Sequence, residues 1–115
     1  MKFSLNQKDL QKSLSYCQGV IEKRSTLQIL SNVLLEAKNS LLTITATDLD
    51  LIFIHRIKDI KIEEEGKITT SSSTMHDVVR KFSPGKKIDI SLGEDNKLML
   101  ESEKSVFHLN CIDSN

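Results

Sequence analysis

The expected order of secondary-structure elements repeats along the chain, and this repeat constrains the fold more than any other feature. Each half reads as a strand, a helix and three further strands, over roughly fifty to sixty residues. The halves share no obvious sequence repeat, so the duplication is one of pattern. It predicts one α+β domain over residues 1–115, with both helices packed on one side of antiparallel sheets.

The first half begins with a short alternating strand at residues 2–5, followed by a helix. Asn6 is a candidate N-cap, and Leu5 and Leu10 stand at the two positions of a hydrophobic staple. Gly19 is a candidate end of this helix. One apolar stripe at helical spacing is formed by Leu10, Leu14, Cys17 and Ile21.

Three strands are expected after the first helix. The first covers residues 33–37, Asn39 and Ser40 make a turn, and the second covers residues 41–47. The third is expected at residues 49–62. Its segment 51–54 is apolar on both faces, which is typical of a covered strand.

The second half follows the charged turn at residues 63–66. A strand at residues 67–71 leads into a helix for which Ser73 or Thr74 is the expected N-cap. Its apolar stripe is formed by Met75, Val78, Val79 and Phe82, and Pro84-Gly85 ends it. Three strands complete the half, beginning at Ile88, Lys97 and Ser105.

Composition narrows the possible functions. Sixteen basic side chains balance sixteen acidic ones, so a nucleic acid could be held only by a local basic face. Cys17 and Cys111 are expected to be buried free thiols, which suits a cytoplasmic protein. There is no apolar run of membrane-spanning length and no signal-peptide pattern at Met1.

No pattern of catalytic residues is visible. His55, His76 and His108 belong to no recognisable nucleophile motif, and hydrogen-bonded structural roles are expected for them. Asp48 and Asp50 make too small a carboxylate set for a metal, and a turn role is favoured. The scattered glycines form no phosphate-binding loop. The chain is therefore predicted not to be an enzyme and to need no cofactor.

Basic side chains group on or beside the two expected helices. If both helices lie on one side of the sheets, these side chains form one basic surface; ordinary solvated charge is the other interpretation. The six residues are Lys8, Lys12, Lys23, Arg24, Arg80 and Lys81.

Two segments resemble one protein family. Residues 24–35 are similar to the R-x-T-L-P-I-L-x-N-hydrophobic run of bacterial DNA sliding clamps, the β subunits of DNA polymerase III, and residues 42–50 resemble their L-x-(I/L)-x-(A/G)-T-D-L-(D/E) stretch. Residues 1–3, 77–80 and 105–109 give weaker matches. Gln28 stands where the family usually has proline, and Ser73 and Thr74 stand where relatives can carry basic side chains.

The resemblance implies a three-domain subunit, of which this chain is the first domain. Two subunits close head to tail into a ring, with helices lining the hole and sheets forming the outer wall. The ring would encircle duplex DNA without reading sequence and act as the processivity factor of the replicative polymerase. Polymerase and clamp loader would bind through later domains, and this domain alone is expected to be monomeric.

The resemblance also assigns sites. Arg24 is the leading DNA contact, and Lys8, Lys12, Arg80 and Lys81 are further charges facing the hole. At the joint between subunits, Phe107 and Leu109 would be apolar contacts and Lys97 and Lys104 their basic companions. From the pattern alone, Phe107 and Leu109 are core residues. Two alternatives stay open: a free-standing interaction module of this fold, and a domain that binds nucleic acid by direct contact.

Overall fold

The computed structural model describes residues 1–24, 32–47 and 51–112, with the side chains of residues 20–24 left undescribed. This part of the chain contains two helices and nine strands. In chain order they are β1 (Lys2–Asn6), α1 (Gln7–Arg24), β2 (Asn32–Lys38), β3 (Leu41–Thr47), β4 (Ile52–Ile57), β5 (Lys61–Glu64), β6 (Gly66–Ser71), α2 (Ser72–Arg80), β7 (Lys87–Leu92), β8 (Lys97–Ser102) and β9 (Ser105–Ile112). The repeated order is confirmed, with β5 as an additional strand.

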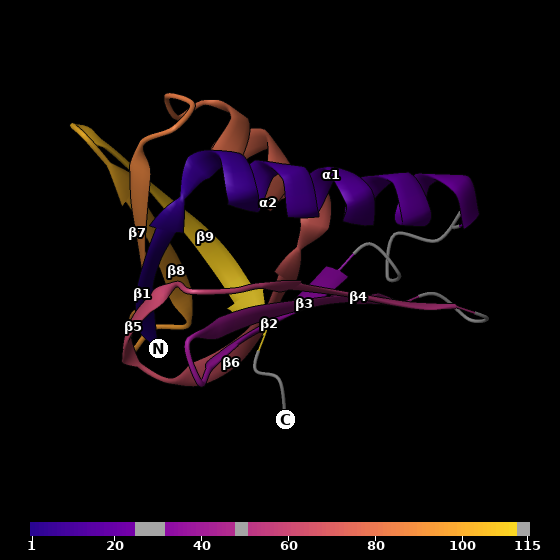
Figure 1. Ribbon diagram of the computed structural model, residues 1–115, viewed down its shortest axis with the longest axis horizontal. Coiled ribbons are helices and arrows are strands. Elements are labelled where there is room, and N and C mark those ends of the chain that lie inside the picture. Colours follow the sequence, from indigo (N-terminus) through magenta and orange to yellow (C-terminus); the bar gives the residue numbers. More distant parts are fainter. Residues whose placement is uncertain (25–31, 48–50, 113–115) are drawn as a thin grey trace.

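The strands form one antiparallel sheet in the order β4-β3-β2-β6-β9-β8-β7-β1-β5. Only two residue pairs, Thr69 with Ile112 and Thr70 with Cys111, join β6 to β9, so the sheet divides there into two parts. Each half of the chain lends its first strand to the other, because β1 pairs with β7 and β6 pairs with β2. Figure 1 shows both helices on the same side of this folded sheet, as predicted.

The first helix begins where the sequence indicates. Asn6 Oδ1 accepts a hydrogen bond from the Lys8 backbone N–H at 2.9 Å, so Asn6 is the N-cap. Leu10, Leu14 and Cys17 lie on one face of the helix, and their side chains are fully buried. Gly19 does not end α1, and that prediction was wrong. A single interior glycine costs about 1 kcal/mol relative to alanine, and the Glu-Lys-Arg run after it favours helix.

The second helix begins earlier than predicted. Its N-cap is Ser71, whose Oγ accepts from the Thr74 backbone N–H at 3.3 Å, and not Ser73 or Thr74. Six consecutive hydroxyl residues, at positions 69–74, make the cap ambiguous from sequence alone, because each is a good N-cap type. The apolar stripe is confirmed: Met75, Val78 and Val79 are buried, as is Phe82 just after the helix.

The β2–β3 hairpin matches the sequence closely. Asn39 and Ser40 have φ of 54° and 63°, the left-handed values that a tight two-residue hairpin turn requires. Along β3, Leu42, Ile44 and Ala46 are fully buried and the threonines between them face away. This alternation places the apolar face of the hairpin against the helices.

The expected strand at residues 49–62 was wrong in two respects. The expected strand is interrupted between β4 and β5, where Asp59 has a positive φ of 59°. The segment 51–54 is not covered: Ile52 is 65% exposed and Ile54 45% exposed. The physical reason is that α1 packs only against the face of β4 that carries Phe53 and His55, so Ile52 and Ile54 project from the face that this domain leaves open.

Candidate nucleic-acid interface

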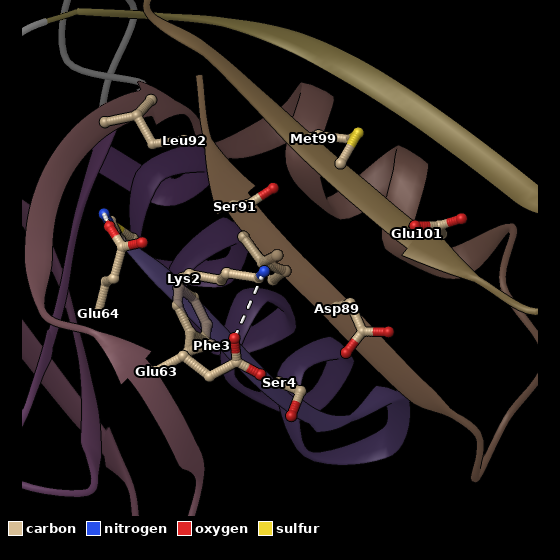
Figure 2. A pocket seen from close by; sticks show the side chains of 12 residues that line it. Lys2, Phe3, Ser4, Glu63, Glu64, Asp89, Ser91, Leu92, Met99 and Glu101 are labelled. Atoms are coloured by element: carbon tan, nitrogen blue, oxygen red, sulfur yellow. Dashed lines mark ion pairs between the residues drawn. The ribbon is translucent and has the colours of Figure 1, made fainter. Parts of the chain in front are cut away.

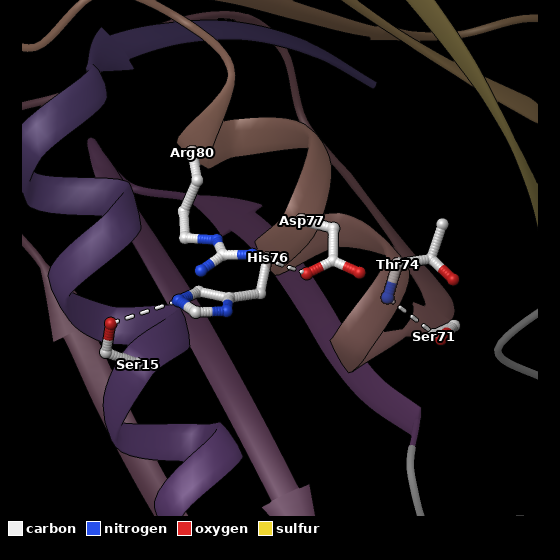
Figure 3. Close-up of polar contacts among 6 residues, drawn as sticks. All are labelled: Ser15, Ser71, Thr74, His76, Asp77 and Arg80. Atoms are coloured by element: carbon white, nitrogen blue, oxygen red, sulfur yellow. Dashed lines mark hydrogen bonds and ion pairs between the residues drawn. The ribbon is translucent and has the colours of Figure 1, made fainter.

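The two helices form one layer. The Gln7 side chain at the start of α1 donates to the Val79 carbonyl of α2 at 2.9 Å. Further along, Ser15 Oγ of α1 lies 3.1 Å from His76 Nε2 of α2. Figure 3 shows this second link between the neighbouring helices. The sheets cover one side of the layer, and the other side is open.

Basic side chains occur on the open side of this layer. Lys8 and Lys12 are exposed one turn apart on α1, away from its buried stripe. Arg80 and Lys81 are exposed at the end of α2. The structure therefore brings these four predicted residues onto one helix layer. Arg24 is the last residue of α1, and its side chain lies outside the described residues.

The charge of Arg80 is partly compensated within α2. Its guanidinium lies 3.1 Å from Asp77 Oδ1, an i,i+3 ion pair between half-exposed side chains (Figure 3). Exposed pairs of this kind contribute little to stability, about 0–1 kcal/mol. The pair does lower the positive potential beside the helix layer. Lys8, Lys12 and Lys81 are in no ion pair within the described residues.

The predicted joint residues lie on β8 and β9. Leu109 is a core residue at 6% exposure, in agreement with the interpretation from pattern. Phe107 is partly buried, and its ring meets Phe82 edge-on at a centroid distance of 5.5 Å. Lys97 and Lys104 are exposed. The structure therefore gives Phe107 a packed inner side while leaving part of the ring accessible.

Besides the end strand β5, β4 and β9 present unpaired edges within the described part of the chain. β9 pairs with β8 along residues 105–110, while on its other side only Cys111 and Ile112 pair, with β6. β4 pairs with β3 and has no strand on its other side within the described part of the chain. The β4 edge was missed by sequence reasoning. Its signal was the run at 51–54, whose two apolar faces were interpreted as those of a strand covered by its own domain.

Two histidines contact serines, but the geometry is not that of a nucleophile and its base. Ser13 Oγ lies 2.6 Å from His55 Nδ1, and Ser13 is fully buried, so no substrate can reach it. The contact of Ser15 with His76 is exposed, and no third group orients the imidazole within the described residues. The contacts tie α1 to β4 and to α2. This agrees with the structural roles expected for His55 and His76.

Both cysteines are free thiols. Burial raises the pKa of Cys17 to about 11, and burial also raises the pKa of Cys111 above its ordinary value. A thiol with a raised pKa is a poor nucleophile at neutral pH. Cys17 is fully buried as predicted, whereas Cys111 is only partly buried.

A cleft of about 450 Å³ lies on the side of the sheet away from the helices. Figure 2 shows Glu63, Asp89 and Glu101 around it, with Lys2 paired to Glu63 at 3.4 Å. Its carboxylates would repel a phosphate backbone, so the cleft is a poor nucleic-acid site.

Neither a metal site nor a membrane span is visible in the described ranges. They contain no group of three or more metal-ligating side chains, while Asp48 and Asp50 lie outside them. Neither helix, as far as it is described, combines the length and apolarity that crossing a bilayer requires.

Comparisons with known proteins agree with one another. A family model described as the N-terminal domain of the DNA polymerase III beta subunit matches residues 1–115. The Beta sliding clamp of Caulobacter vibrioides is 36% identical over 110 residues, 95% of this chain and 29% of the relative. That of Escherichia coli K12 is 30% identical over 112 residues, 97% of this chain and 30% of the relative.

Solved structures give the same result. The crystal structure of the DNA polymerase sliding clamp from Pseudomonas aeruginosa matches with a TM-score of 0.89 at 31% identity, covering all of this chain and 31% of that one. The sliding clamp from Caulobacter crescentus matches with a TM-score of 0.88 at 34% identity, covering 99% of this chain and 31% of that one. This chain therefore spans less than a third of the length of these relatives.

Proposed function

The chain belongs to the DNA polymerase III beta subunit family, as its N-terminal domain, and we propose that it is one segment of a ring that encircles duplex DNA. The ring acts as a sliding clamp and processivity factor, because it holds the replicative polymerase on its template by topology. The observation that carries the proposal is the open helix layer with exposed basic side chains, in a domain whose total charge is balanced.

That charge distribution suits a ring that has to slide. Each phosphate neutralised by a cation contributes a slope of about −0.9 to the logarithm of affinity against the logarithm of salt concentration. Many such contacts would hold the ring in place. Lys8, Lys12, Arg80 and Lys81 are few and exposed, which fits weak contacts that do not depend on sequence.

Arg24 is the leading DNA contact, on the strength of its place in the family motif. Arg24→Ala in the full-length protein is expected to weaken DNA binding. Salt-dependent affinity equal to that of the wild type would remove Arg24 from the interface.

The open strand edges support assembly into a ring. β4 exposes Ile52 and Ile54, and β9 leaves residues 105–110 unpaired on one side. Exposed edges bind other strands readily, and native proteins usually block or cover them. In the proposed ring each edge continues into the sheet of a neighbouring domain. The sheets then form an unbroken outer wall, with the helices inside.

The joint between subunits is assigned to the β9 edge. Phe107 supplies an aromatic ring that is packed on one side by Phe82, and such anchored rings often dominate binding energy at interfaces. Leu109 supports the ring from the core, and Lys97 and Lys104 offer charges to acidic partners.

The remaining roles belong to the whole assembly. The polymerase and the clamp loader bind through domains beyond this one, and the protein works in the cytoplasm. The domain has no catalytic part in this function. Its task is to close the ring and to present a weakly basic inner surface.

Topological tethering can be tested with the full-length protein. The protein is loaded onto nicked circular DNA, the DNA is linearised, and retention is followed by gel filtration in moderate salt. Loss of the protein on linearisation is expected, because a ring slides off free ends. Retention on the linear DNA would contradict the proposal and indicate binding by direct contact.

A further inference from the structure

The cleft of about 450 Å³ on the sheet face away from the helices takes no part in the proposed DNA contact. Its lining residues come from four neighbouring strands, β5, β1, β7 and β8, and from Met1. We propose that this cleft binds an arginine side chain of a partner protein. The inference goes beyond the proposed function, on which only the position of the cleft on the outer wall of the ring rests.

Carboxylates outnumber cations in the cleft. The acidic side chains that line it are Glu63, Glu64, Asp89 and Glu101. Lys2 lies 3.4 Å from Glu63, and the ammonium group of Met1 lies 3.6 Å from Glu64. Among the described residues no other cation lines the cleft, so two carboxylates remain without a cation from the cleft itself. This excess of negative charge attracts a cation and repels a phosphate.

The two remaining carboxylates repel each other. Asp89 on β7 and Glu101 on β8 are direct partners in the antiparallel register. Side chains in such positions are about 5 Å apart at Cβ, and like charges there are destabilising. Asp89 has an exposed ion pair with Lys87 at 3.7 Å, whereas Glu101 forms no ion pair within the described part of the chain. A cation bound between the two carboxylates would replace their repulsion by attraction.

A buried hydroxyl lies beside the carboxylate pair. Ser4 on β1 is the register partner of Asp89, so Ser4, Asp89 and Glu101 form one row across three strands (Figure 2). Phe3 and Leu5 point into the core, which directs Ser4 to the opposite face, where it lines the cleft. Ser4 is only 8% exposed, and its hydroxyl makes no hydrogen bond within the described residues. Since buried hydroxyls are normally paired, a ligand is expected to supply the missing partner.

This row matches a guanidinium group better than other cations. An arginine presents several N–H donors in a planar fork that can bond two carboxylates and a hydroxyl at once, whereas a lysine ammonium is a point charge. A metal ion is a poor fit, because no group of three metal-ligating side chains occurs in the described ranges. Met99 and Leu92, both partly buried, line the same cleft and can pack along the methylene stem of the arginine.

The position of the cleft favours a protein as the source of this arginine. In the proposed ring the sheets form the outer wall, and the cleft opens on that wall, away from the helices that face the DNA. No neighbouring domain is expected to cover it, because β5 beside it is the short charged end of the sheet. A protein that approaches the ring from outside can therefore reach the cleft, and arginine is a residue type enriched at such interfaces.

The test titrates the full-length protein, isotope-labelled at its methionine methyl groups, with an end-blocked glycine peptide that carries one central arginine. The NMR signal of Met99, assigned through Met99→Leu, reports binding in the cleft and is expected to shift until it saturates. Glu101→Gln should raise the dissociation constant about threefold or more, because it removes a charge-assisted hydrogen bond. Ser4→Ala should raise it about twofold. Glu36→Gln is the matched control, since it removes the same charge from β2, on the same sheet face but outside the cleft.

A dissociation constant that Glu101→Gln leaves unchanged, or that Glu36→Gln raises equally, would overturn the inference. An equal shift of the Met99 signal by a peptide with citrulline, which keeps the shape of arginine without its charge, would do the same. A peptide with lysine should bind more weakly than the arginine peptide, and equal binding of the two would contradict the assignment of a guanidinium site.

The main variant is expected to remain folded. Glu101 is exposed, and Glu101→Gln removes its repulsion from Asp89, so it should not lower the melting temperature of the full-length protein. A loss of peptide binding then reflects the cleft and not unfolding. Loss of the protein from linearised DNA is a separate readout, so the ring proposal stands or fails independently of this site.

Discussion

The two ends of the sheet have opposite characters. β5 at one end is four residues long, carries a lysine and two glutamates, and exposes little apolar surface. β4 at the other end is six residues long and exposes Ile52 and Ile54. Short charged edge strands resist pairing with other chains, whereas longer apolar ones invite it. The β5 edge is thus suited to solvent and the β4 edge to a neighbour.

The last strand of each half of the chain has an unpaired edge. β4 is the last strand of the first half and β9 the last strand of the second, and each has one edge unpaired over most of its length. A domain in which each half ends in a strand with an open edge can pair with a neighbouring domain on two sides. Such a building block is what a closed ring requires, whereas a lone domain would gain nothing from exposed isoleucines.

The largest expected effect comes from the core next to the β4 edge. Ile44 on β3 is fully buried, so Ile44→Ala should lower the free energy of unfolding of the chain by about 2–5 kcal/mol. Urea unfolding measures this difference. Ile54→Ala on the adjacent strand should change it by only about 0.5 kcal/mol. If Ile54→Ala lowered the free energy of unfolding as much as Ile44→Ala, Ile54 would belong to the domain's own core.

The next effect concerns the β9 edge. Phe107→Ala in the full-length protein should weaken dimerisation at least tenfold, about 1.4 kcal/mol, because it removes an anchored ring from the proposed joint. Sedimentation over a range of concentrations gives the dissociation constant. Ile62→Ala on β5 is the control, because Ile62 is partly buried like Phe107 but lies on the strand that no neighbour covers. An unaltered dimer for Phe107→Ala would remove β9 from the joint.

A smaller effect is expected from a charge on the β4 edge. Ile54→Asp should leave the stability of the 115-residue chain within about 0.5 kcal/mol, since the side chain is already exposed. In the full-length protein it should lower the melting temperature, because the carboxylate would be buried against the next domain. Lys61→Asp on β5 should change neither the stability of the chain nor the melting temperature of the full-length protein. An equal fall in melting temperature for Lys61→Asp would show that the two edges do not differ.

At neutral pH the smallest effect is expected from the buried thiol. The folded-state pKa of Cys17 is about 11, against an ordinary value of 9.0, so the thiol is neutral in both states below pH 9. The free energy of unfolding should therefore be independent of this group at neutral pH and fall as pH rises from 9 to 11. Cys17→Ala should reduce that fall in urea titrations, and Cys111, whose pKa burial also raises, should account for part of what remains. A fall in the variant equal to that of the wild type would contradict the prediction.

Local signals in the sequence predicted much of the fold. The Asn6 cap, the stripe of Leu10 and Leu14, and the Asn39-Ser40 turn each depend on contacts between near neighbours. The motif at residues 24–35 indicates the family through its residue types alone, although residues 25–31 lie outside the described ranges. What the sequence did not predict depends on position within the sheet. Periodicity shows that β4 is apolar, but not whether its own domain covers it.

The candidate site was predicted less completely, for a related reason. Helical spacing placed Lys8 and Lys12 away from the apolar stripe of the first helix, and Arg80 and Lys81 beside the stripe of the second. All four are exposed, and their contact with DNA stays a prediction. His55 is far from α1 in sequence, and only the pairing of β4 with β3 brings its ring beside Tyr16. No local pattern carries that proximity.

Hydrogen–deuterium exchange of the 115-residue chain and of the full-length protein compares the two edges most directly. The central claim is that neighbouring domains continue the β4 and β9 edges and leave β5 free. Peptides covering β4 and residues 105–110 of β9 should exchange much more slowly in the full-length protein, while peptides covering β5 should exchange equally in both. Equal exchange of β4 in the two proteins would contradict the claim.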